Sequence, residues 1–166
     1  MKAKDPNLTA AQVRSLLNYD PATGIFRWRV KPCQRLQVGA IAGSRHSVGY
    51  WNIKIEGKLV MAHRLAWLIT YGRWPANQLD HINGKRNDNR IDNLRECTRA
   101  ENYQNKCLYK NNTSSYPGVN QVHENKWRAR IRLDGKLRHL GYFSTPEKAY
   151  QAYVLAKREL HPYGTL

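Results

Sequence analysis

The first half of the chain contains segments with the hydrophobic period of a helix and others with the period of a strand. Thr9 and Gln12 form a capping-box pattern, which predicts a helix start before an apolar-sided segment. Gly72 is placed to end a later helix. The predicted elements are, in chain order, a helix at 9–17, a strand at 25–30, a hairpin at 51–61 and a helix at 63–71.

Residues 127–133 alternate strictly between apolar and basic side chains, which is the period of a strand. The basic face carries Arg128, Arg130 and Arg132. A hairpin turn, a return strand at 138–143 and a helix opened by Pro146 follow. The whole pattern predicts an α+β fold that ends in a small three-stranded sheet packed on one helix.

A polar segment without apolar periodicity separates these two halves. We therefore expect a catalytic unit at 1–109, a linker at 110–115 and a compact C-terminal unit at 116–166.

The net charge says more about the partner of this protein than the rest of the composition does. The chain has 28 Lys and Arg against 12 Asp and Glu, which gives a net charge of +16 over 166 residues. Such a field favours nucleic acid or an anionic membrane surface as partner. The sequence has no apolar run long enough to span a bilayer and no signal peptide, so we expect an intracellular protein with no membrane partner.

The three cysteines, Cys33, Cys97 and Cys107, are odd in number and widely spaced. This spacing argues against both a disulfide framework and a zinc site built on cysteine pairs. We expect reduced thiols and no structural zinc.

The residues that could carry out a reaction lie between positions 79 and 102, in the later part of the first unit. His81 can serve as a general base because an unperturbed imidazole is largely neutral near pH 7. Asp80 and Asn102 offer hard oxygen donors of the kind that Mg²⁺ binds. Asp80 and His81 are predicted on a short strand before an Asn83-Gly84 turn, whereas Thr98 and Glu101 predict a capped helix that carries Asn102.

These residues resemble the HNH endonucleases, a family built on a ββα-metal unit. The resemblance rests on the segments 79–84, 88–94 and 100–102. It implies that His81 is the general base, that Asn93 braces the loop, and that Asp80 and Asn102 hold a divalent metal, Mg²⁺ or alternatively Mn²⁺. The third motif position is Asn102, where many members of the family have His.

Other polar residues nearby have plainer interpretations. Asn87, Asp88 and Asn89 are interpreted as turn formers, because Asx side chains often bond their own backbone. His63 lies at the start of a predicted helix, and we place it outside the catalytic set.

The C-terminal segment resembles the AP2 DNA-binding domain over about residues 116–161, through Gly118-Val119, Leu140-Gly141 and the apolar positions between them. That resemblance implies contact with double-stranded DNA by Arg128, Arg130, Arg132 and His139. Asn120 and His139 depart from the residues that are common at their positions, Arg and Trp.

Together these features predict a metal-dependent, homing-type DNA endonuclease of phage kind, acting in the cytoplasm of a bacterial host and with no obligate protein partner evident. Two alternatives stay open: a DNA-binding regulator without catalysis, and an RNA-binding protein.

Overall fold

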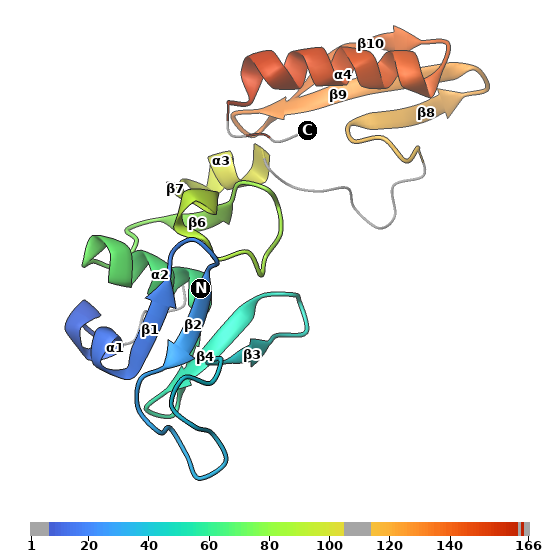
Figure 1. Ribbon diagram of the computed structural model, residues 1–166. Helices are drawn as coiled ribbons and strands as arrows, with labels where there is room; N and C mark the ends of the chain where they lie inside the picture. The colour runs from blue at the N-terminus through green and yellow to red at the C-terminus, as the bar shows by residue number, and fades with distance from the viewer. Residues whose placement is uncertain (1–6, 105–113, 163, 165–166) are drawn as a thin grey trace. The chain divides into compact units, whose positions relative to one another are not determined.

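The computed structural model describes residues 7–104, 114–162 and 164 (Figure 1). The chain folds into two compact units, Met1–Cys97 and Thr98–Leu166. Both units combine helices with small antiparallel sheets, so the predicted α+β class is confirmed. Among the described helices, none is both long and apolar enough to cross a membrane.

The first unit contains three small sheets and two longer helices. Its elements are α1 (Ala10–Leu16), β1 (Leu17–Asp20), β2 (Ile25–Trp28), β3 (Ser44–Arg45), β4 (Trp51–Ile55), β5 (Lys58–Met61), α2 (Ala62–Tyr71), β6 (Gln78–His81), the short 3-10 helix η1 (Ile91–Asn93) and β7 (Leu94–Cys97). Strand β1 pairs with β2, β4 lies between β3 and β5, and β6 pairs with β7.

The predicted helix ends of the first unit are present. Thr9 and Gln12 form both halves of the capping box at the start of α1. Gly72 ends α2 in the left-handed conformation with φ of 72°, and its N–H bonds the carbonyl of Leu68. A residue with a Cβ would be strained in that conformation, which explains the glycine.

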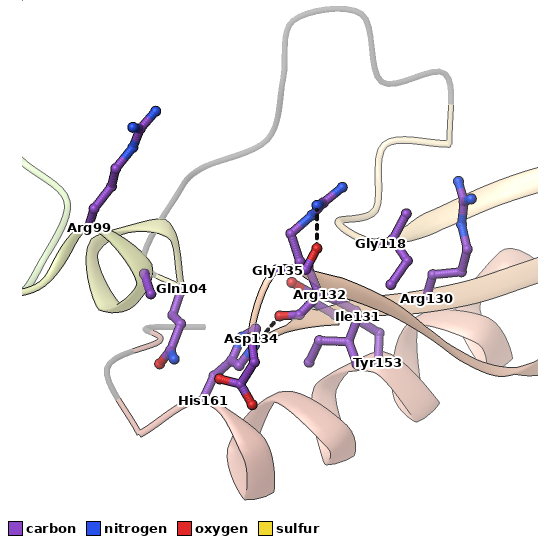
Figure 2. A pocket seen from close by; sticks show the side chains of 12 residues that line it. Arg99, Gln104, Gly118, Arg130, Ile131, Arg132, Asp134, Gly135, Tyr153 and His161 are labelled. Carbon is purple, nitrogen blue, oxygen red and sulfur yellow. Dashed lines mark hydrogen bonds between the residues drawn. The ribbon is translucent and has the colours of Figure 1, made fainter.

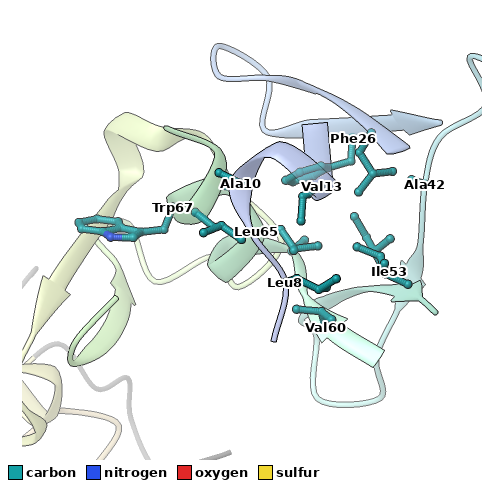
Figure 3. Packing of buried hydrophobic residues seen from close by; sticks show 14 of the residues in the cluster. Leu8, Ala10, Val13, Phe26, Ala42, Ile53, Val60, Leu65 and Trp67 are labelled. Atoms are coloured by element: carbon teal, nitrogen blue, oxygen red, sulfur yellow. The ribbon is translucent and has the colours of Figure 1, made fainter. Parts of the chain in front are cut away.

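One apolar core joins α1, α2 and the sheets of the first unit (Figure 3). Val13, Ile53 and Leu65 have no exposed surface. Leu59 and Met61 are the alternating apolar residues that the sequence predicts for the return strand of the hairpin. In the structure the inward residue of β5 is instead Val60, which is 4% exposed, while Leu59 is 68% exposed. This follows from the register of β4 on β5, which places Val60 opposite the buried Ile53.

The second unit contains a three-stranded sheet with one long helix. Its elements are α3 (Arg99–Gln104), β8 (Val119–His123), β9 (Lys126–Leu133), β10 (Lys136–Phe143) and α4 (Pro146–Leu160). The strand order is β10-β9-β8, and α4 packs against all three strands. Ala129 and Ile131 on β9 are buried together with Ala149 on α4. The sheet and helix predicted from the sequence are therefore present.

The domain boundaries and the linker at 110–115 expected from the sequence stay a prediction. The two compact units divide after Cys97. Residues 105–113 lie outside the described residues. Ser114, near the end of the predicted linker, is buried, and its hydroxyl donates to the carbonyl of Val119 at 2.7 Å.

Candidate functional site

Asp80 and His81 lie at the end of β6, where the strand pairs with β7. Both side chains are buried, at 8% and 4% exposure. Arg95, which is the cross-strand partner of Asp80, donates two hydrogen bonds to its Oδ2, at 3.0 Å from Nε and 2.7 Å from Nη2. A buried carboxylate needs such a partner, because an unpaired charge in a dry site is costly. The pair therefore fixes the carboxylate of Asp80 on β6, where Asp80 precedes His81 in the chain.

Two rings contact that of His81: His63 on α2 and Tyr50 in the loop before β4. The ring of His63, at the start of α2, stands edge-on to His81 with centroids 5.1 Å apart. Tyr50 lies against both, at 5.4 Å from His63 and 5.9 Å from His81. The sequence placed His63 outside the catalytic set, and the structure shows that it contacts the candidate base directly. The position of His63 next to His81 results from the packing of α2 in the first unit.

Burial lowers the pKa of both imidazoles, because a charged ring is poorly solvated there. The pKa of His63 falls to about 3, first through burial and then through the neighbouring His81 and Arg64. The pKa of His81 is also lowered by burial, although its contact with Asn89 and the charge of Asp80 oppose the shift. His81 is therefore neutral at physiological pH and able to accept a proton.

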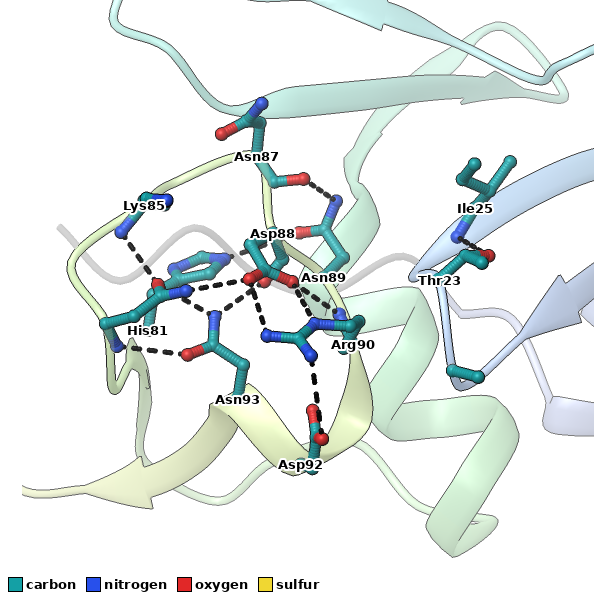
Figure 4. A network of polar contacts seen from close by, with 12 residues as sticks. Thr23, Ile25, His81, Lys85, Asn87, Asp88, Asn89, Arg90, Asp92 and Asn93 are labelled. Carbon is teal, nitrogen blue, oxygen red and sulfur yellow. Dashed lines mark hydrogen bonds and ion pairs between the residues drawn. The ribbon is translucent and has the colours of Figure 1, made fainter.

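Asn93 joins the two ends of the loop between β6 and β7 (Figure 4). Its Oδ1 accepts from the backbone N–H of Asn83 at 3.0 Å, and its Nδ2 donates to the carbonyl of Asp88 at 2.9 Å and to Oδ1 of Asn83 at 3.0 Å. Its backbone carbonyl accepts from Ile82 at 2.9 Å. This is the geometry expected of a loop brace, while a part for Asn93 in catalysis stays a prediction.

Asp88 and Asn89 do more than form a turn. Arg90 donates to both carboxylate oxygens of Asp88, at 2.9 and 3.0 Å, and this hydrogen bonding holds the pKa of Asp88 below its usual value. Asn89 is 3% exposed, and its Oδ1 lies 3.3 Å from Nε2 of His81 (Figure 4). This contact is not visible in the sequence, because nothing in the local pattern separates Asn89 from the exposed Asn87.

Asn102 lies in α3, in the second unit. The capping box predicted at the start of α3 is present. The Glu101 carboxylate accepts from the backbone N–H of Thr98 at 2.6 Å, and the backbone N–H of Glu101 donates to the Thr98 hydroxyl at 3.3 Å. The convergence of Asn102 with Asp80 on one metal ion stays a prediction. Within the described residues, no group of three or more His, Cys, Asp or Glu side chains is arranged to hold a metal.

The predicted DNA-contacting residues lie on β9 and β10, in the sheet whose other face is covered by α4. Arg128, Arg130 and Arg132 alternate with the buried Ala129 and Ile131, and therefore project from the open face. Figure 2 shows Arg130 and Arg132 leaving β9 on the same side.

Two of these guanidinium groups have fixed partners. Nη2 of Arg130 donates to Oδ1 of Asn120 on β8 at 2.9 Å, and Nη1 of Arg132 donates to the carbonyl of Gly135 at 2.9 Å. Opposite Arg130 on β10, His139 contacts the ring of Tyr142 with centroids 4.6 Å apart. The open face thus combines ordered cations with exposed aromatic rings.

A cavity of about 710 Å³ lies in the second unit and shares no lining residue with the His81 cluster (Figure 2). Among its lining residues is His161, whose Nε2 lies 2.8 Å from the carbonyl of Arg132. Since a carbonyl only accepts, Nε2 must carry the proton in this bond. His161 therefore ties the end of α4 to β9.

Comparison with known proteins shows similarity over part of the chain. Residues 60–104 match the family described as HNH endonuclease. A protein of Acanthamoeba polyphaga mimivirus, described as an uncharacterized HNH endonuclease, is 30% identical over 105 residues, which are 63% of this chain and 54% of that relative. The chain thus spans about half the length of this relative. No solved structure matched.

The family match covers the end of β5 and every element from α2 to α3, and so includes Asp80, His81, Asn93 and Asn102. It ends before the three-stranded sheet. The resemblance of residues 116–161 to the AP2 domain therefore stays a prediction.

Proposed function

We propose, from the match of residues 60–104 to the HNH endonuclease family, that the protein is a divalent-metal-dependent endonuclease that hydrolyses double-stranded DNA. The observation that carries the proposal is the buried imidazole of His81, whose pKa is lowered by burial and which directly follows the Arg95-bound Asp80 on β6. Phosphodiester hydrolysis needs a base to take a proton from water and positive charge to offset the charge that builds on the phosphate.

In this proposal His81 is the general base. Oδ1 of Asn89 accepts a hydrogen bond, so Nε2 of His81 carries its proton and the lone pair lies on Nδ1. Nδ1 then takes the proton of the attacking water. Asn93 keeps the loop that carries Asn89 closed on β6, through its bonds to Asn83 and Asp88.

The donor set fits a hard divalent cation, Mg²⁺ or Mn²⁺, because Asp80 and Asn102 supply one carboxylate and one amide oxygen. Such an ion supplies positive charge at the phosphate when bound. Arg95 holds the Asp80 carboxylate through two bonds to Oδ2, which limits the orientations that the ligand can adopt.

Binding of the duplex is assigned to the second unit, as an AP2-like reader. Its support is the open face with Arg128, Arg130 and Arg132, where no acidic side chain alternates with the arginines along β9. His139 lies opposite Arg130 on β10 and extends this face. We further propose a homing-type enzyme of phage kind that cuts near the site held by this sheet.

The test is cleavage of supercoiled plasmid by the full chain with Mg²⁺ or with EDTA. The wild-type protein should cut only with the metal. His81→Ala should lower the cleavage rate by at least about 100-fold, the scale expected for loss of a positioned base, while DNA affinity changes little. The exposed His46 supplies the matched control, and His46→Ala should cut like the wild type.

Two outcomes would overturn the proposal. Wild-type binding of plasmid without any metal-dependent cutting would favour a DNA-binding regulator. Cutting by His81→Ala at the wild-type rate would remove His81 from the mechanism.

A further inference from the structure

The contact between Asn89 and His81 has a defined direction. Nδ2 of Asn89 donates to the carbonyl of Asn87 at 3.3 Å, which turns Oδ1 towards Nε2 of His81. An acceptor at this position selects the tautomer with the proton on Nε2. A base that must act through Nδ1 depends on that choice, because only one nitrogen of a neutral imidazole carries the lone pair.

The backbone of Asn89 is in turn held by the β1–β2 hairpin. The hydroxyl of Tyr19 on β1 donates to the carbonyl of Asn89 at 2.8 Å. Burial raises the pKa of Tyr19, so the hydroxyl keeps the proton that it donates. The carbonyl of Pro21, in the hairpin turn, accepts from the N–H of Ile91 at 3.4 Å.

Gly24 makes this approach feasible. A Cβ at Gly24 would lie 2.5 Å from the backbone N of Arg90 and 2.6 Å from the carbonyl carbon of Asn89. These are backbone atoms, which cannot move aside as a flexible side chain would. The φ of Gly24 is also +72°, a conformation that L side chains rarely adopt. Two independent contacts thus seat the hairpin against the loop at Asn89.

We propose that the β1–β2 hairpin is a positioning element for the reaction: Tyr19 and Gly24 fix the backbone of Asn89, and Asn89 fixes the tautomer and orientation of His81. Asn89 and Tyr19 are positioning residues, since neither touches the reacting atoms in this scheme. The inference rests on the proposed function. It adds a requirement for residues 17–28, which lie outside the segment that matches the HNH endonuclease family.

The experiment uses the full chain and two readouts. Nitrogen NMR of the metal-free protein reports which nitrogen of His81 carries the proton, independently of activity. Single-turnover cleavage at saturating protein reports the chemical step. Asn89→Leu removes the acceptor, Asn89→Asp retains an acceptor oxygen, and Asn87→Leu is the matched control at an exposed position in the same loop.

Asn89→Leu should lose the single Nε2-protonated tautomer and cleave about 100-fold more slowly, as expected when a catalytic group is misplaced by about 1 Å. Asn89→Asp should keep the tautomer and recover most of the rate. Asn87→Leu should match the wild type in both readouts. Tyr19→Phe, which removes only a hydroxyl, should keep the fold and slow cleavage about 3- to 10-fold. This variant tests the inference if Asn89→Leu does not fold.

The outcomes separate this inference from the proposed function. A wild-type tautomer in Asn89→Leu, or a wild-type cleavage rate in both Asn89→Leu and Tyr19→Phe, would overturn the inference while leaving the nuclease intact. The wild-type protein could also cut no DNA while Asn89→Leu loses the Nε2-protonated tautomer of His81. That result would overturn the proposed function but keep the positioning of His81 by Asn89.

Discussion

At the scale of single residues, sequence neighbours have very different environments in this protein. Asn87 and Asn89 have the same side chain in the same loop, yet Asn87 is exposed and Asn89 is 3% exposed against His81. The sequence predicted Asp80, His81 and Asn93 as the chemical residues, because their types and spacing resemble a known motif. It did not predict Asn89, Tyr50 or His63 as their neighbours, since contacts between distant segments have no local signature.

The buried His63 predicts how the stability of the first unit depends on pH. Its pKa is about 3 in the folded protein and about 6.5 when unfolded. Between these values the unfolded chain binds a proton that the folded protein does not. The free energy of unfolding should therefore fall as the pH falls from 6.5 towards 3, by up to about 1.4 kcal/mol per pH unit from this group.

Urea unfolding at several pH values, followed by tryptophan fluorescence, measures this slope. In His63→Phe the slope of the unfolding free energy against pH should be smaller by up to about 1.4 kcal/mol per pH unit, the effect of one bound proton. Some pH dependence should remain in this variant, because burial also lowers the pKa of His81. The groups near the His63 ring are His81, Tyr50 and Arg64. His46→Phe, at an exposed position, is the control and should retain the wild-type slope. An unchanged slope in His63→Phe would show that the ring is charged or solvated in the fold.

At the scale of elements, periodicity was a good guide where one face of a strand or helix meets a core. The alternation of β9 predicted its buried and open faces, because side chains on a strand point alternately to its two sides. Periodicity was a poor guide at β5, where Leu59 is exposed and Val60 is buried. The register with β4 decided which residues face inward there, and register depends on a partner strand.

The packing of α4 on its sheet depends on Gly118. A Cβ at this position would lie 2.3 Å from Cδ2 of Tyr153 on α4 and 2.5 Å from the carbonyl of Arg130. Gly118→Ala should therefore push α4 from β9 and destabilise the second unit by several kcal/mol, at the upper end of point-mutant effects. The comparison is Gly135→Ala, which has a similar positive φ but no atom within 4 Å.

Gly135→Ala should cost only the backbone strain, about 1 kcal/mol. Thermal unfolding of the second unit, followed by hydrogen exchange of amides in β9 and α4, distinguishes the two variants. Equal losses in Gly118→Ala and Gly135→Ala would mean that the close contact with Tyr153 relaxes without cost, contrary to this prediction.

At the scale of the whole molecule, the net charge of +16 and the two units fit the proposal that one unit binds DNA and the other cuts it. A catalytic site with few protein ligands for its metal gains from a second binding surface on the same chain, because tethering raises its effective concentration on DNA. The open arginine face of the second unit is the candidate surface. Counterion release then makes its affinity fall steeply with salt.

Replacing Arg128, Arg130 and Arg132 by Gln should weaken DNA binding and lower the slope of log affinity against log salt by about 0.9 for each lost phosphate contact. Binding isotherms at salt concentrations from about 50 to about 300 mM measure it. Arg158→Gln, on an exposed position of α4, removes one charge outside the open face and should change the slope by less than a single contact does. A wild-type slope in the triple variant would place the DNA contacts elsewhere on the chain.

The helix starts and ends, the two faces of β9, the positive charge and the residue types of the candidate site follow from the sequence alone. These properties are local: caps, turns and periodicity depend on residues a few positions apart. Only the tertiary structure decided that Tyr19 and Gly24 lie against Asn89, that His63 and Tyr50 surround His81, and that Arg95 pairs with Asp80. Each of these contacts joins residues that are at least 15 positions apart, so it exists only once strands have paired and a core has closed around the imidazole.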